Sequence, residues 1–176
     1  MQEFLEEEAD IAREQDSEPS HVSAKVFEIP IYQVKLSPAL VVKETDSVLK
    51  VIELMQANKM GVVCVTNGKD KLKGIVTERD IVLKGLGKGK RWEDIPVKSI
   101  MTPKPFFLHK DDPLVLAMHN MHIGGYRNIP VLDSHEHVTA VITIQNVMKY
   151  LMDQFPKEID NILDEPFTGE HFRESA

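Results

Sequence analysis

Apolar and polar positions along the chain follow one pattern that is written twice between about residue 34 and residue 150. Adding 66 to a residue number superimposes the two copies without a gap from Val41 onward, so that Thr77 falls on Thr143. Upstream of Val41, residues 36–38 match residues 101–103 after a slip of one position. An internal repeat of this kind indicates two structural units of the same type.

The first half of each copy predicts a strand, an acidic turn and a helix. The strands are expected at 40–42 and 106–108, and the turns at 44–47 and 110–113 can cap the helices that follow. Apolar residues recur at helical spacing in both helices. They are Val48, Val51, Ile52, Leu54 and Met55 in the first copy and Leu114, Val115, Ala117, Met118 and Met121 in the second.

The second half of each copy predicts two strands joined by a polar turn and a closing helix. The strands are expected at 62–66 and 72–76, and at 128–132 and 138–142, with helices that begin near Glu78 and Ile144. One such unit is too small to bury its helices and sheet alone. We therefore predict an α/β (α+β) fold in which two strand-helix-strand-strand-helix repeats pack sheet face to sheet face as a pseudo-twofold module.

These patterns divide the chain into four parts. Residues 1–33 form an acidic arm and a lead-in, 34–90 the first repeat with its linker, 91–155 the second repeat, and 156–176 a C-terminal extension. The linker residues 84–91 are basic and rich in glycine. They do not form a phosphate loop, because no apolar strand leads into them and no Ser or Thr follows their lysines.

The net charge of −7 is concentrated in residues 1–20, and the rest of the chain is balanced. Nothing resembles the basic face that nucleic-acid binding requires. No apolar run approaches the roughly 20 residues of a membrane-spanning helix, and the acidic start does not fit a secretory signal. The single cysteine, Cys64, lies in an apolar run and is expected in the core. We expect a soluble, cytoplasmic protein that binds neither nucleic acid nor membrane.

Candidate chemistry lies where the last strand of the first copy meets its helix. Thr77 and Asp80 stand there one helical turn apart, where free backbone N–H groups and the helix dipole favour an anion. The Thr77 hydroxyl can hold phosphate, and the Asp80 carboxylate can accept hydrogen bonds from both hydroxyls of a ribose. The alternative is that the two residues only cap the helix.

The segment Gly74–Asp80 resembles the motif at the end of the last strand in CBS (cystathionine-β-synthase) domains. Residues 99–103 resemble the lead-in to a second CBS domain, and 126–133 resemble its second strand. The chain is thus similar to a stand-alone tandem CBS pair, also called a Bateman module. This resemblance implies that a nucleotide lies in the cleft between the copies.

The resemblance also implies residues for that cleft. Thr102, Tyr126, Arg127 and Asn128 would line the adenine, and Arg127 could reach phosphate as a forked donor. Arg79, beside Asp80, is another phosphate candidate.

The second copy departs from the motif. It keeps Thr143 but has Ala140 in place of Gly74 and Asn146 in place of Asp80. An amide lacks the charge of a carboxylate, so we predict a second site that is weaker by about 1–2 kcal/mol or empty.

These features favour a non-catalytic sensor. AMP, ADP, ATP or S-adenosylmethionine would shift the relative pose of the copies and modulate an unidentified protein partner. The resemblance further implies a homodimer. An interaction scaffold with vestigial sites is the alternative, and a nucleotide hydrolase is a third hypothesis for which no catalytic constellation is visible. A metal site is conceivable at His119 and His122, three apart on a helix, and at His135 and His137 in a turn. The helical pair falls on the polar side of its helix and is expected in solvent, so no metal is predicted.

Overall fold

A computed structural model describes residues 25–68, 71–85, 89 and 91–154 of the chain. The acidic arm at 1–20, the C-terminal extension at 156–176 and residues 86–88 and 90 of the predicted linker lie outside the described residues. The helices are α2 (Lys25–Glu28), α3 (Val48–Asn58), α4 (Glu78–Asp80), α5 (Leu114–Gly124) and α6 (Ile144–Gln154), with a π-helical turn at Ile81–Gly85 and 3-10 turns at Ile31–Gln33, Trp92–Asp94 and Val97–Ser99. The strands are β1 (Ser37–Pro38), β2 (Val41–Lys43), β3 (Val62–Thr66), β4 (Leu72–Thr77), β5 (Thr102–Pro103), β6 (Leu108–His109), β7 (Asn128–Leu132) and β8 (Val138–Thr143).

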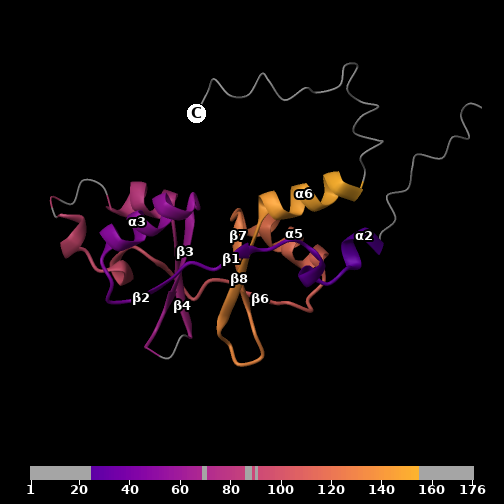
Figure 1. Cartoon of the computed structure of the whole chain (residues 1–176), viewed down its shortest axis with the longest axis horizontal. Coiled ribbons are helices and arrows are strands. Elements are labelled where there is room, and N and C mark those ends of the chain that lie inside the picture. Colours follow the sequence, from indigo (N-terminus) through magenta and orange to yellow (C-terminus); the bar gives the residue numbers. More distant parts are fainter. Residues whose placement is uncertain (1–24, 69–70, 86–88, 90, 155–176) are drawn as a thin grey trace, which may run out of the picture.

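The described strands form two four-stranded sheets of the same design (Figure 1). Their orders are β2-β3-β4-β5 and β1-β8-β7-β6. In each sheet a parallel pair, β2 with β3 or β6 with β7, lies next to an antiparallel pair, β3 with β4 or β7 with β8. The predicted mixed fold and the repeat of strand, helix, strand, strand and helix are confirmed.

Each copy receives one short strand from the lead-in of the other. In the second sheet β1 pairs with β8, and Ser37 lies opposite Val141. In the first sheet β5 pairs with β4, and Thr102 lies opposite Ile75. Ile75 and Val141 are 66 residues apart, whereas Ser37 and Thr102 are 65 apart, which is the predicted one-residue slip. This exchange ties the two copies together.

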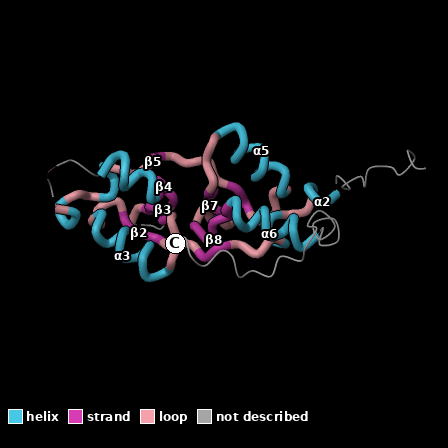
Figure 2. Tube along the Cα trace, turned by 90° about the horizontal axis from the view of Figure 1, so that it is seen from above, coloured by secondary structure: helices cyan, strands magenta, loops and turns pink. Residues whose placement is uncertain are grey.

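The hydrophobic core of each copy also contains residues from the lead-in of the other copy. Ile31 and Val34, from the first lead-in, pack in the core under α5 and α6, and Ile95 and Ile100, from the second lead-in, pack in the core under α3. A third cluster lies where the sheets face each other and contains Val62, Cys64, Ile75 and Val141. The sheets thus meet face to face while the helices lie on the outer sides, as Figure 2 shows from above.

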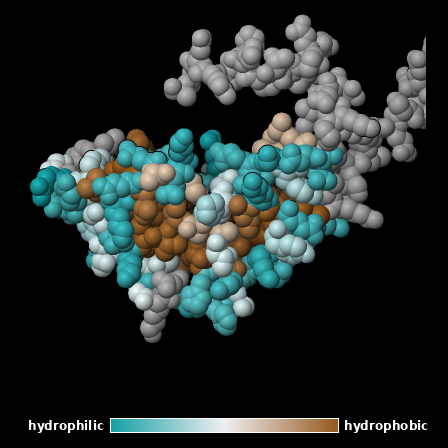
Figure 3. Space-filling model, viewed as in Figure 1, coloured by the Kyte–Doolittle hydropathy of each residue, from teal (hydrophilic) through white to brown (hydrophobic). Residues whose placement is uncertain are grey.

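A further tie joins the hairpins at the edge opposite the helices. Lys71, directly before β4, forms an isolated antiparallel bridge with His137 and donates from its ammonium group to the backbone oxygen of His135. Its Nζ atom also lies 3.2 Å from Glu136 Oε2. Figure 3 shows mostly hydrophilic residues over the helices and the β7–β8 hairpin on this face, with apolar residues between them. No helix in the described part of the chain is long and apolar enough to cross a membrane.

Three sequence predictions need correction. The strand expected at 106–108 begins only at Leu108, and Phe106 and Phe107 are exposed. Val115 is also exposed, because the buried face of α5 consists of Leu114, Ala117 and Met121. The helix that begins at Glu78 has only three α-helical residues and continues as the π-helical turn.

Candidate functional site

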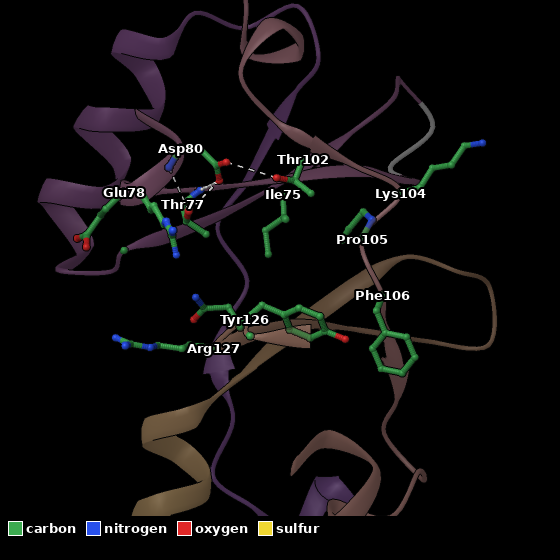
Figure 4. Close-up of a pocket in the computed structure, with 14 residues that line it drawn as sticks. Ile75, Thr77, Glu78, Asp80, Thr102, Lys104, Pro105, Phe106, Tyr126 and Arg127 are labelled. Carbon is green, nitrogen blue, oxygen red and sulfur yellow. Dashed lines mark hydrogen bonds between the residues drawn. The ribbon is translucent and has the colours of Figure 1, made fainter. Parts of the chain in front are cut away.

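The junction between β4 and α4 is fixed by a reciprocal set of hydrogen bonds between Thr77 and Asp80 (Figure 4). The backbone N–H and the hydroxyl of Thr77 donate to Asp80 Oδ2 at 2.9 Å and 2.7 Å. The backbone N–H of Asp80 donates in return to Thr77 Oγ1 at 3.3 Å. This is a capping box. The capping role considered from the sequence is therefore present, and it holds the Asp80 carboxylate in one orientation.

The other carboxylate oxygen of Asp80 meets two further groups. The Thr102 hydroxyl donates to Asp80 Oδ1 at 3.3 Å, and Lys84 Nζ lies 2.5 Å from the same atom. Partial burial alone would raise the pKa of Asp80. Hydrogen bonds from Lys84 and Thr77, together with the Lys84 charge, outweigh that effect and hold the pKa below its ordinary value. Asp80 is consequently ionised at neutral pH.

A cleft of about 680 Å³ opens beside this carboxylate, between the two copies. It brings together seven residues that the sequence singled out: Thr77, Arg79, Asp80, Thr102, Tyr126, Arg127 and Asn128. It is also lined by Gly61, Ile75, Glu78, Lys104, Pro105, Phe106 and Gly125, which the sequence analysis did not select. In Figure 4 the polar residues Thr77, Asp80 and Thr102 face Tyr126 and Phe106 across the opening.

The wall contributed by the second copy is aromatic. Tyr126 is half-buried, and Phe106 lies beside it at the mouth of the cleft (Figure 4). The Tyr126 ring rests against Gly124, where any side chain would collide with it. Two aromatic faces opposite a carboxylate suit a ligand that has a flat ring at one end and hydroxyl groups beside it.

Gly74 is required by the close approach of β5. A Cβ atom at this position would lie 2.6 Å from Met101 Sδ and 3.1 Å from the backbone oxygen of Thr102. A larger residue would therefore push β5 away from β4 and move the Thr102 hydroxyl away from Asp80. The second copy has Ala140 at the same position, opposite Pro38.

A second cleft of about 540 Å³ repeats this arrangement. The backbone N–H and the hydroxyl of Thr143 each donate to Asn146 Oδ1 at 2.8 Å. The hydroxyl of Ser37 donates to the same atom at 3.3 Å, as Thr102 does in the first cleft. Ser37 was not predicted as a site residue, although the 65-residue offset of the lead-ins places it on Thr102. The cleft is lined by Ser37, Lys59, Met60, Gly61, Val62, Glu78, Arg127, Asn128, Thr143, Gln145 and Asn146.

The two clefts share one wall. Gly61, Glu78, Arg127 and Asn128 line both of them. The first cleft carries three cationic side chains, Arg79, Lys104 and Arg127, against the two carboxylates of Glu78 and Asp80. A ligand with a limited negative charge would therefore be accepted there.

The histidines do not form a metal centre in the part of the chain that the structure describes, where no group of three potential ligands comes together. His119 and His122 are exposed on α5. His137 Nδ1 lies 3.4 Å from Asp133 Oδ2, in the turn of the β7–β8 hairpin.

Comparison with known proteins agrees with this architecture. The CBS domain profile matches residues 31–87 and 97–153. The chain belongs to the CBS-domain family and contains two copies of the domain. CBS domain-containing protein CBSCBSPB2 of Arabidopsis thaliana is 31% identical over 123 residues, which are 70% of this chain and 22% of that protein. The chain thus spans about a fifth of the length of this plant relative.

Solved CBS pairs share the fold. The CBS domain pair of protein MJ0100, determined in complex with 5'-methylthioadenosine and S-adenosyl-L-methionine, aligns with a TM-score of 0.64 and 19% identity over 71% of this chain and 97% of that chain. The structure of CBSX2 in complex with AMP aligns with a TM-score of 0.61 and 22% identity over 72% of this chain and 98% of that chain.

Proposed function

We propose that this protein is a regulatory CBS pair that senses an adenosyl ligand in the first cleft and modulates a protein partner without catalysis of its own. The ligand would be AMP, ADP, ATP or S-adenosylmethionine. The observation that carries the proposal is the ionised Asp80 carboxylate, fixed by Thr77 and Thr102 and facing an aromatic wall. The AMP complex of CBSX2 and the adenosyl complex of MJ0100 support the same ligand class.

In this proposal the adenosyl group bridges the copies. Its ribose hydroxyls donate to Asp80, on the side of the first sheet, and its adenine lies against Tyr126 and Phe106, on the side of the second copy. A phosphate or carboxylate tail is within the range of Arg79 and Arg127, which line the same cleft. Contacts to both copies give the ligand a different affinity for each relative pose, and this difference is what allows binding to change the pose.

The second cleft should bind more weakly. Asn146 offers one carbonyl oxygen, and that oxygen already accepts from Thr143 and Ser37. The second cleft is lined by Met60 at the repeat position that Tyr126 has in the first cleft. We therefore propose one ligand per chain under ordinary conditions.

The same proposal includes a homodimer in the cytoplasm. Large apolar side chains are exposed on the outer helices α5 and α6, where another copy could cover them. They are Val115, Leu116, Ile123, Met148 and Met152. Light scattering of the purified protein tests the dimer. A monomer at micromolar concentration would contradict this part of the proposal.

The ligand assignment is tested by calorimetric titration of the purified protein with AMP, ADP, ATP and S-adenosylmethionine. We expect one of them to bind with a stoichiometry of one per chain and to raise the melting temperature. If none of the four binds, the sensor proposal fails, and a scaffold that works through the exposed helices becomes the better account.

A further inference from the structure

Asp80 has no spare acceptor capacity in this structure. An ionised carboxylate offers about four lone-pair positions. The N–H and the hydroxyl of Thr77 occupy two of them on Oδ2. The Thr102 hydroxyl and the Lys84 ammonium occupy two on Oδ1. A ribose that donates two hydroxyls to this carboxylate must therefore displace groups that already bind it.

The donors differ in how easily they can leave. The bond from the Thr77 N–H belongs to the capping box that starts α4, and its loss would leave this helix terminus uncapped. The Thr77 hydroxyl is held beside the same carboxylate because its oxygen accepts from the backbone N–H of Asp80. The Thr102 hydroxyl is held in place by the pairing of β5 with β4, although its hydrogen can rotate. Lys84 is different, because its side chain is 42% exposed and its ammonium can move into water at little cost.

Lys84 owes its position to the π-helical turn. It is the fourth residue after Asp80 and lies in the turn Ile81–Gly85. From there its Nζ atom also donates to Thr102 Oγ1 at 3.2 Å. The ammonium thus bridges the two residues of the first cleft that offer oxygen atoms to a ribose. In the second copy the residue at the equivalent repeat position is Tyr150, which is not a basic residue and packs against the core of that copy.

We propose that Lys84 is a tethered competitor of the ligand for Asp80 and thereby lowers the affinity of the first cleft for a nucleoside. This inference rests on the proposed function and specifies how that function is tuned. Binding of a ribose replaces the Lys84 ammonium at Oδ1 and frees the Thr102 oxygen as an additional acceptor.

The test uses adenosine, which is neutral and gives Lys84 no phosphate to bind. Adenosine is titrated by calorimetry into the wild type, Lys84→Met, Lys84→Arg and Lys50→Met. The last variant removes another i,i+4 ion pair, between Lys50 on α3 and Asp46 in the turn that precedes this helix, in which Lys50 Nζ lies 2.9 Å from Asp46 Oδ2. Neither residue lines a cleft. Loss of the competitor should tighten adenosine binding by about fivefold in Lys84→Met. Lys84→Arg and Lys50→Met should stay close to the wild type.

Salt gives a second readout that a purely structural role would not produce. Screening weakens the Asp80–Lys84 pair, so adenosine should bind the wild type more tightly at 500 mM than at 50 mM sodium chloride, to the extent of about twofold. Lys84→Met should show no such dependence.

Three results would overturn the inference. Unchanged affinity in Lys84→Met would show that Lys84 does not compete, and weaker binding would make it a residue that positions Asp80. If the wild type and all variants fail to bind adenosine, AMP, ADP, ATP and S-adenosylmethionine alike, the proposed function fails, and the inference fails with it. Equal melting temperatures of the variants serve as the folding control.

Discussion

The hydroxyl of Ser37 donates to Asn146 Oδ1 at 3.3 Å across 109 residues of sequence. The first cleft contains the same contact, between Thr102 and Asp80, at the same distance. In each case a residue from the lead-in of one copy lines a cleft beside the other copy. It lies where the last strand of that other copy meets the following helix. The two clefts therefore repeat the same hydrogen-bond arrangement at the start of the helix, where the first has a carboxylate and the second an amide.

This relationship predicts that Asn146→Asp creates a second strong site. The new carboxylate would keep the contacts with Thr143 and Ser37 and add the charge that strengthens a hydrogen bond from ribose. Calorimetry should show the stoichiometry rise from one to two ligands per chain. Asn120→Asp, on α5 and away from both clefts, is the control with the same change in charge. A stoichiometry that stays at one in Asn146→Asp would contradict the equivalence of the clefts.

The aromatic wall predicts a separate loss of affinity. Tyr126→Leu removes the ring against which adenine is proposed to stack, and binding should weaken by about three- to tenfold. Tyr32→Leu removes a tyrosine that is 57% exposed and lines neither cleft, so its affinity should match the wild type. Equal affinities in the two variants would place the adenine elsewhere.

Cys64 offers a probe of the contact between the copies. Its thiol is fully buried in the cluster between the two sheets, and burial raises its pKa to about 12. A thiol reagent should therefore react with the native protein far more slowly than with the protein unfolded in guanidinium chloride. A bound adenosyl ligand should slow the native reaction further, because it bridges the copies. A native rate equal to that of the unfolded chain would contradict this packing.

The lowered pKa of Asp80 predicts that the folded protein loses stability as the pH becomes acidic. The folded pKa of Asp80 lies below the ordinary value of 3.8, so its ionised form stabilises the fold above that value. The contribution is lost as the pH falls through the folded pKa. The melting temperature of the wild type should exceed that of Asp80→Asn above about pH 5, and the difference should shrink below about pH 4. A difference that grows with acidity would contradict the assignment.

The repeat made much of the fold predictable. Strands β3 and β7 have the predicted bounds, since each is a run of β-forming residues between polar turns. Thr77 and Asp80 could be selected from the sequence because they stand where a strand meets a helix, and the residues of the second copy were added to their cleft because the resemblance to CBS domains implies a shared cleft.

Three other residues of the site could not be predicted from the pattern of apolar and polar positions. Phe106 was expected in a strand, because apolar spacing does not distinguish a residue in a sheet from one that lines a cleft. Ser37 depends on a strand exchange that only the pairing of β1 with β8 reveals. Lys84 was assigned to a linker because glycines follow it, whereas the π-helical turn directs it back to Asp80.

The most direct test of the account is calorimetry on Asp80→Asn with whichever adenosyl ligand binds the wild type. Asn146 shows that an amide preserves the capping contacts at this junction, so the variant removes mainly the charge. Asp46→Asn, which removes the carboxylate of the Lys50 pair outside both clefts, is the matched control. The account predicts that Asp80→Asn binds about tenfold more weakly and that Asp46→Asn is unchanged. Wild-type affinity in Asp80→Asn would contradict the claim that this carboxylate binds the ligand.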